Sequence, residues 1–226
     1  MNYNFIKNKG GALYSAFIFI FFTSCISISK IIIGFKNPTV ITIEELKGIR
    51  NQIFNDDIGD YYYKEGIKDS IFLNKILSLS FSGNLNIYNK DKKKIFFKNS
   101  TCINDDLEII NKNIDSLIYV SNDILDDKIK NLMNLNLNEP NKISNFKNYD
   151  YYIIYYWSSF MNKKNLIKNE FKFLEQNFNS ENCKIIRINC DFLDIWNLEK
   201  GKKIKLKFKR DNDDYYDVSF KSIPWK

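Results

Sequence analysis

Histidine is absent from this chain of 226 residues, and its absence removes the commonest general base and the commonest metal ligand of proteins. A hydrolase that depends on a Ser-His-Asp or Cys-His arrangement is therefore excluded. Zinc would find only carboxylates and scattered cysteines as ligands, so we predict no metal site. No other pattern in the sequence indicates a cofactor.

Cysteine is scarce as well, with four residues and no Cys-x-x-Cys pair. Cys183 and Cys190 lie seven residues apart on one predicted strand, which places their Cα atoms more than ~20 Å from each other. A disulfide needs less than about 7 Å, so these two cannot pair. Outside the N-terminal segment, Cys102 is then the one candidate for a reactive or bridging thiol; the alternative is a buried, inert cysteine.

The net charge of +7 comes from 34 basic and 27 acidic side chains, and the lysines are spread along the chain among the acids. Nucleic-acid binding needs basic side chains gathered on one face, so we predict no nucleic-acid partner. Hydrophobic residues make up 44% of the chain and aromatic residues 16%, which is enough to bury a core. General disorder is therefore excluded.

The first 25 residues have the three-part layout of a secretory signal, with two lysines, the apolar run 16–22 and a small-residue end. Residues 22–25, Phe-Thr-Ser-Cys, resemble a bacterial lipobox, whose cysteine is diacylated and becomes the new N-terminus; Phe22 replaces the usual leucine. We therefore predict a signal peptide over residues 1–25, lipidation of Cys25 and a tether over residues 26–37. Each buried acyl methylene adds ~0.8 kcal/mol of membrane affinity.

Two alternatives remain open for this segment. Residues 12–33 approach the ~20 apolar residues of a transmembrane helix, so an uncleaved anchor would also fit. Cleavage without lipidation would release the body. All three place the body outside the cytoplasm, and the lipid anchor makes it a membrane-anchored protein of the cell envelope, a periplasmic or outer-membrane lipoprotein.

A stretch rich in asparagine predicts a linker over residues 138–149, between an N-terminal α/β portion, 38–137, and a second portion, 150–226. The two portions form either one larger sheet or two separate lobes. This division sets the expected domain organisation of the body.

Sequence patterns predict several elements in the first portion, among them a helix over residues 105–113, a short strand over 117–120 and a helix that begins at 122 or 123. Thr42 and Glu45 have the spacing of a capping box and predict a helix over residues 43–54. Serines that alternate with leucine and phenylalanine predict a strand over residues 77–81. Two short apolar runs around a lysine-rich turn predict a hairpin over residues 85–98.

The second portion has the clearer patterns. A continuous apolar run predicts a fully buried strand over residues 151–157, an amphipathic stripe predicts a helix over 162–178, and a second strand follows over 184–189. These elements form a right-handed βαβ unit. Residues 203–209 and 216–220 predict a last hairpin with one apolar face and one row of lysines, which either meets an anionic surface or is a solvated face that blocks edge pairing.

Residues 151–196 resemble the thioredoxin-like family, in its extracytoplasmic disulfide-reductase, or redoxin-like, branch. Such proteins have a buried strand that ends in Phe-Trp-Ala-Ser-Trp-Cys-Gly-Pro-Cys, then a helix and a strand that ends near an aspartate. Here residues 156–164 are Tyr-Trp-Ser-Ser-Phe-Met-Asn-Lys-Lys, and Cys190 and Asp191 end the second strand. The resemblance implies an α/β fold, with a mixed sheet flanked by helices and a C-terminal β-hairpin.

The sequence departs from the family at its chemistry. Met161 falls where the family has the nucleophilic cysteine, and Lys164 falls where it has the resolving cysteine. A thioether cannot form a thiolate, so disulfide exchange cannot run at this position. We therefore predict no catalytic residue there.

The resulting hypothesis is a membrane-tethered envelope lipoprotein whose redox-inactive domain binds a protein or peptide. The expected binding residues form an apolar patch at the end of the first strand: Trp157, Ser158, Phe160 and Met161. Two alternatives stay open, a thiol-disulfide oxidoreductase that uses Cys102 and a structural accessory protein of the envelope.

Overall fold

The computed structural model describes residues 36–54, 59–64, 69–81, 85–97, 109–110, 118–135, 149–161, 164–178, 181–210 and 216–226. The predicted signal segment with Cys25, the thiol of Cys102 and residues 138–148 of the predicted linker lie outside these ranges. No helix within the described ranges combines the length and the apolar character that crossing a bilayer requires.

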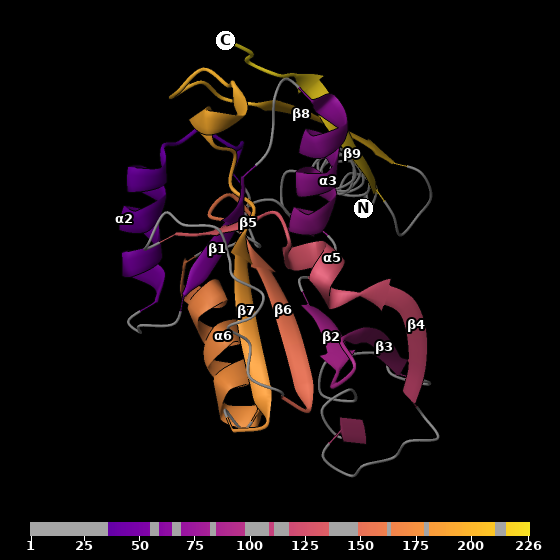
Figure 1. Ribbon diagram of the computed structural model, residues 1–226. Coiled ribbons are helices and arrows are strands. Elements are labelled where there is room, and N and C mark those ends of the chain that lie inside the picture. Colours follow the sequence, from indigo (N-terminus) through magenta and orange to yellow (C-terminus); the bar gives the residue numbers. More distant parts are fainter. Residues whose placement is uncertain are drawn as a thin grey trace, which may run out of the picture.

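One mixed sheet of seven strands organises the body, in the order β4-β3-β2-β6-β7-β1-β5 (Figure 1). β6 lies next to β7 in parallel and next to β2 in antiparallel orientation. Strands of both predicted portions therefore belong to one sheet. Their bounds are Asp60–Tyr63 for β1, Leu85–Asn89 for β2, Lys93–Phe97 for β3, Ile118–Ile124 for β4, Leu132–Asn134 for β5, Tyr151–Trp157 for β6 and Cys183–Asn189 for β7.

The predicted βαβ unit is confirmed as β6, helix α6 (Lys164–Asn177) and β7. α6 buries one stripe, made of Ile167, Phe171 and Leu174, against the sheet. Because β6 has neighbours on both sides and helices over both faces, nearly all of its side chains are buried, which explains the continuous apolar run.

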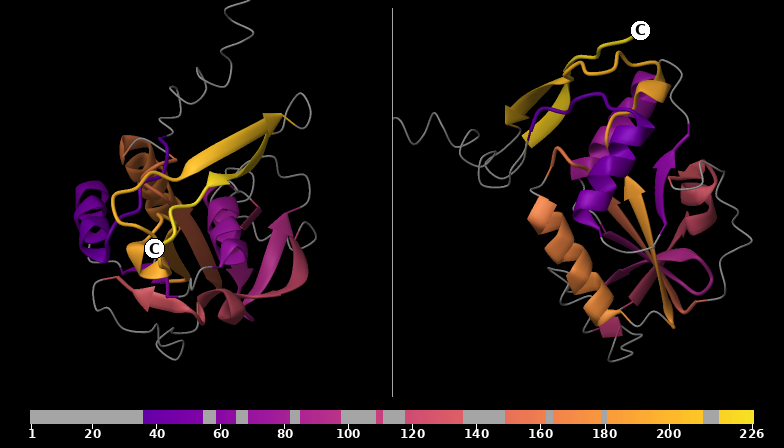
Figure 2. Two further views of the ribbon diagram at one scale, coloured as in Figure 1. Left: turned by 90° about the horizontal axis from the view of Figure 1, so that it is seen from above. Right: turned by 90° about the vertical axis from the view of Figure 1, so that its left-hand side faces the viewer.

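Helix α2 (Ile43–Ile53) lies beside α6 on the same face of the sheet (Figure 2). Its predicted capping box is present. The Thr42 hydroxyl accepts from the amide of Glu45 at 3.1 Å, and the Glu45 carboxylate accepts from the amide of Thr42 at 2.8 Å. These bonds satisfy two backbone donors that the first helical turn leaves unpaired.

The strand predicted over residues 77–81 is wrong, because this segment belongs to helix α3 (Ser70–Phe81), on the opposite face of the sheet. The buried side chains of α3 follow helical spacing and are Leu73, Ile76, Leu77 and Ser80. Ser80 is accommodated in the helix because its hydroxyl donates to the carbonyl of Ile76 at 2.9 Å. The carboxylate of Asp69 accepts from the amide of Ile71 at 2.8 Å and caps the first turn.

Both predicted hairpins are confirmed. β2 and β3 pair in antiparallel orientation, and so do β8 (Lys205–Arg210) and β9 (Tyr216–Ser222), which form a separate C-terminal hairpin. The described connections include α5 (Leu125–Ile129) before β5 and a 3₁₀ turn (Asp194–Trp196) after β7. The fold class is therefore α/β, with a mixed sheet flanked by helices and a C-terminal β-hairpin, as the sequence predicted.

Candidate functional site

The predicted binding patch lies at the carboxyl end of β6, and the structure buries most of it. Trp157, Ser158 and Phe160 are only 2%, 3% and 4% exposed, whereas Met161 is partly exposed. The prediction of an exposed apolar patch is therefore wrong for three of the four residues, which belong to the core.

The patch is buried because the chain closes over the end of β6 and β7. We call residues 36–41 the entry segment. The amide of Lys36 donates to the carbonyl of Phe160 at 2.7 Å, and the amide of Ile41 donates to that of Phe192 at 2.9 Å. The Phe160 and Phe192 rings pack together with centroids 5.7 Å apart. The entry segment joins the end of the predicted tether to the start of the predicted body, and its backbone covers the ends of β6 and β7.

A buried carboxylate joins the two strand ends beneath this segment. The Asp191 carboxylate accepts from the Ser159 hydroxyl at 2.8 Å, from the Ser159 amide at 3.0 and 3.1 Å, and from the Asn189 side-chain amide at 2.8 Å. Burial raises the pKa of Asp191 above its usual range, although these hydrogen bonds oppose the rise. Its donors are Ser159, in the turn after β6, and Asn189, at the end of β7. The carboxylate therefore holds this turn against the end of β7.

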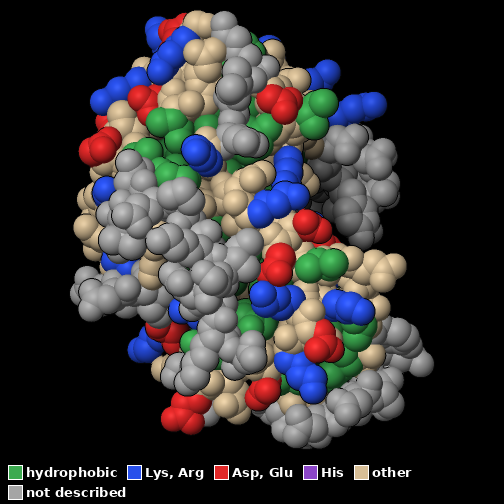
Figure 3. All heavy atoms as spheres, viewed as in Figure 1, with side chains coloured by type: hydrophobic (Ala, Val, Ile, Leu, Met, Phe, Trp, Pro, Cys, Tyr) green, Lys and Arg blue, Asp and Glu red, His purple; other side chains and the backbone are tan. Residues whose placement is uncertain are grey.

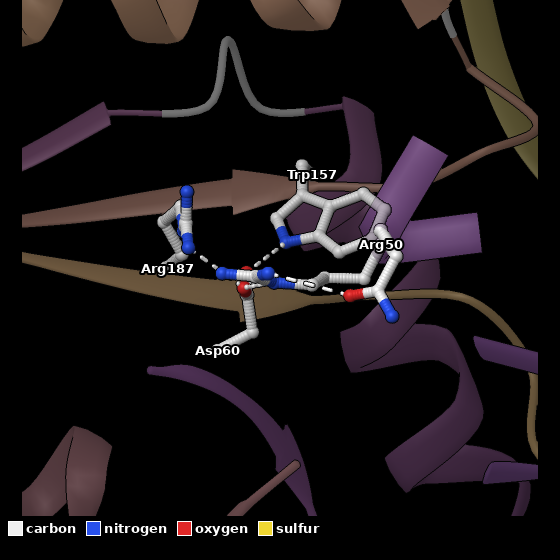
Figure 4. Close-up of polar contacts among 5 residues, drawn as sticks. Arg50, Asp60, Trp157 and Arg187 are labelled. Atoms are coloured by element: carbon white, nitrogen blue, oxygen red, sulfur yellow. Dashed lines mark hydrogen bonds and ion pairs between the residues drawn. The ribbon is translucent and has the colours of Figure 1, made fainter. Parts of the chain in front are cut away.

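A second buried carboxylate lies behind Trp157, under helix α2 (Figure 4). One oxygen of Asp60, on β1, accepts from the Trp157 indole nitrogen at 3.1 Å. The other accepts from Arg50 Nε and from an Arg187 terminal nitrogen, both at 2.8 Å. Asp60 and Arg187 are fully buried and Arg50 is 6% exposed. We call these four residues the Asp60 cluster; they join α2, β1, β6 and β7.

Aromatic rings complete the environment of Arg187. Its guanidinium carbon lies 4.1 Å from the ring centroid of Phe54 and 4.5 Å from that of Phe171. Cation–π attraction of this kind stabilises a desolvated guanidinium. Tyr155, the β6 neighbour of Arg187, donates its hydroxyl to Glu170 at 2.8 Å, which brings a further negative charge to this face. The described partners of the Arg187 guanidinium are therefore the Asp60 carboxylate and the faces of two aromatic rings.

Sequence reasoning missed the Asp60 cluster, although one signal was present. The chain has only three arginines, and two of them, Arg50 and Arg187, converge on Asp60. In a chain that otherwise uses lysine, an arginine inside an apolar strand indicates a planar, multidentate ion pair, which lysine cannot replace. The partner could not be inferred, because Asp60 lies 127 residues from Arg187 in the sequence.

The described cysteines are unsuited to redox chemistry. Cys183 and Cys190 are both buried and neither forms a disulfide, which confirms that they do not pair. Burial raises the pKa of the Cys183 thiol to about 12, and it also raises the pKa of Cys190. Lys164, at the position of the family's second cysteine, donates to the side chain of Gln52. No thiolate is therefore available at this end among the described residues.

The described side chains also support neither metal binding nor catalysis by tyrosine. Within the described ranges, no three acidic, cysteine or histidine side chains are grouped as a metal would require. Burial raises the pKa of three tyrosines on the α3 face of the sheet, so their phenols stay protonated: Tyr63, Tyr88 and Tyr156. The arrangement can hold strands together, and the thiols of Cys183 and Cys190 and these three phenols stay protonated.

Comparison of the chain with protein-family profiles, with curated proteins and with solved structures gives no match.

The first prediction concerns the Asp60 carboxylate. Replacing it in Asp60→Asn leaves two buried guanidinium groups without their counter-charge, so the free energy of unfolding should fall by about 3–5 kcal/mol. The control is Asp126→Asn, which removes a surface carboxylate paired with Lys92 at 3.0 Å and should cost at most ~1 kcal/mol. Urea unfolding followed by circular dichroism measures both. Equal, small losses in the two variants would show that the Asp60 cluster contributes little.

The second prediction concerns pH. Burial raises the pKa of Asp191 in the folded state above the ordinary value of 3.8. The folded state therefore binds this proton more tightly than the unfolded state does, and below pH 3.8 Asp191 adds to the free energy of unfolding. This stabilisation is lost as the pH rises through the folded-state pKa. As the pH falls, the unfolding free energy of the wild type should therefore rise relative to that of Asp191→Asn. Urea titrations of both proteins at a series of pH values measure the shift. A difference that is independent of pH, or that moves the other way, contradicts the assignment.

Proposed function

We propose that the chain is a membrane-tethered lipoprotein of the cell envelope whose α/β body is redox-inactive and binds a protein or peptide. The layout of residues 1–25 supports the tether. The parallel β6–α6–β7 unit, with Trp157 at the end of its first strand and Asp191 just after its second, supports the thioredoxin-like resemblance. The body is then a member of that fold used without its thiol chemistry.

One observation supports inactivity above all others: among the described residues, no ionisable thiol lies at the end of β6. The end of β6 has Met161 in place of the nucleophile, and the described cysteine that directly follows β7, Cys190, is 0% exposed. Exchange requires a thiolate that can reach a disulfide sulfur, and burial opposes both ionisation and access.

The binding part of the proposal concerns the side chains that remain accessible at this end. Met161 and Ser159 are partly exposed, next to the buried Trp157 and Phe160. Methionine side chains adapt their shape to varied apolar partners. A partner at this end would therefore contact Met161 and the turn around it, and Trp157 would support that turn from below.

The third prediction tests inactivity. In an insulin-reduction assay with dithiothreitol, the full chain should not accelerate precipitation above the rate without protein, because its described cysteines are buried and positions 161 and 164 hold methionine and lysine. The matched comparison is a double variant, Met161→Cys with Lys164→Cys, which restores the family's cysteine spacing in the same body. Turnover by the wild type that disappears in Cys102→Ser would reject the proposal and establish the alternative, an oxidoreductase that uses Cys102.

The fourth prediction tests the anchor. Cells that express the chain should incorporate labelled palmitate into it, and Cys25→Ala should abolish the label, because diacylation occurs on that sulfur. Cys183→Ala, which removes a buried body cysteine, is the matched control and should leave the label unchanged. Equal labelling of Cys25→Ala and the wild type, or no labelling of either, would exclude a lipid anchor at Cys25.

A further inference from the structure

A row of lysines covers one face of the C-terminal hairpin. Lys205, Lys207 and Lys209 occupy alternate positions of β8, and all three are exposed. Lys203, two residues earlier, and Lys221, which follows the same alternation on β9, are exposed as well. We call these five residues the lysine face. Figure 3 shows basic side chains along the upper right edge of the molecule, where Figure 1 places the hairpin.

The opposite face of the hairpin is already used for packing. Phe208 of β8 contacts Phe81 of α3, with ring centroids 6.3 Å apart, and Phe220 of β9 contacts Phe192 at 5.8 Å. Ile204, just before β8, is fully buried. Because side chains alternate across a strand, these contacts turn the lysine face away from the body.

Some lysines of the body are held in ion pairs. Several exposed or half-exposed lysines elsewhere pair with a carboxylate: Lys92 with Asp126, Lys128 with Asp123, Lys130 with Asp127 and Lys200 with Glu45. Among the residues whose side chains are described, no ion pair involves a member of the lysine face. Asp217 of β9 lies opposite Lys209 in the register, so the other four lysines carry most of the charge that an anionic partner would meet.

The lysine face begins where the chain enters the body. Lys203 pairs with Thr39 of the entry segment in an antiparallel bridge, and the amide of Ile204 donates to the carbonyl of Pro38 at 2.9 Å. Figure 2 shows the start of the entry segment beside the hairpin. The predicted tether, residues 26–37, therefore joins the body at the same end as the lysine face.

We propose that the lysine face docks on the anionic phospholipid headgroups of the membrane that holds the chain, an inference that rests on the tether of the proposed function. From Lys203 to Lys209 the face is about 20 Å long, and the tether extends to roughly 35 Å, so the face reaches the surface of its own membrane. Tethering keeps the body at high local concentration, and several lysines near anionic headgroups are attracted together. Docking would fix the orientation of the body and hold the opposite end of the sheet away from the bilayer.

The experiment uses the full chain, reconstituted into vesicles of phosphatidylcholine alone or of phosphatidylcholine with phosphatidylglycerol. Flotation reports whether the chain stays with the vesicles. Amine acetylation, followed by mass spectrometry, reports the accessibility of each lysine. Lys168 and Lys172, exposed on α6, are internal references.

In the anionic vesicles, the lysine face should be acetylated about threefold or more slowly than in neutral vesicles, while Lys168 and Lys172 are unchanged. High salt should remove the protection, because it screens the headgroup charge. In the variant Lys205→Gln/Lys207→Gln/Lys209→Gln, Lys203 and Lys221 should lose their protection. The control Lys90→Gln/Lys93→Gln/Lys130→Gln removes as many exposed charges elsewhere, leaves both reference lysines in place and should keep the protection.

The possible failures are distinguishable. A chain that floats with both vesicle types but shows no lipid-dependent protection overturns the docking and leaves the tether intact. A chain that floats with neither overturns the tether, and the docking with it. A chain that floats only with anionic vesicles, and only while the lysine face is intact, supports the surface and overturns the tether. Protection that the control variant loses equally would indicate attraction by net charge and would overturn the assignment to this face.

Discussion

The arrangement of this body depends on one buried carboxylate and its three donors. Asp60 holds Arg50 of α2, Trp157 of β6 and Arg187 of β7 from its position on β1, so that four elements meet at a single charge. Such a cluster is costly to bury, because three charged side chains leave water together. Its geometry offsets the cost through short hydrogen bonds and through the rings of Phe54 and Phe171 on either side of Arg187.

This constraint explains why the end of β6 is closed. In the family that the sequence resembles, a tryptophan and two cysteines at this point meet a polypeptide. Here the indole of Trp157 is turned inward to Asp60, the entry segment covers Phe160, and Asp191 ties the following turn to β7. Trp157 is therefore part of the interior. Its burial and the absence of cysteine at positions 161 and 164 are consistent with one another: the strand end is used for packing.

Much of the fold was accessible to sequence reasoning, because it follows from local patterns. The apolar run of β6, the stripe of α6 and the capping box of α2 depend on neighbours within a few residues, and all three are confirmed. Helix α3 was missed because leucines and serines that alternate over five residues fit a strand, while the twelve residues of the whole segment fit a helix. Only the burial of the side chains from Leu73 to Ser80 distinguishes the helix from the strand. The Asp60 cluster depends on partners 10, 97 and 127 residues away, a relation that no local pattern encodes.

The central claim is that Trp157 is an interior residue held by Asp60, and hydrogen exchange of its indole N–H tests it most directly. Nuclear magnetic resonance resolves the indole protons of the three tryptophans, and Trp225, which is only partly buried, serves as the internal reference. The account predicts that the Trp157 indole proton exchanges only through global unfolding, with a protection that matches the unfolding free energy of the whole body. Exchange of Trp157 as fast as that of a freely exposed indole, in a protein that is otherwise folded, would contradict it.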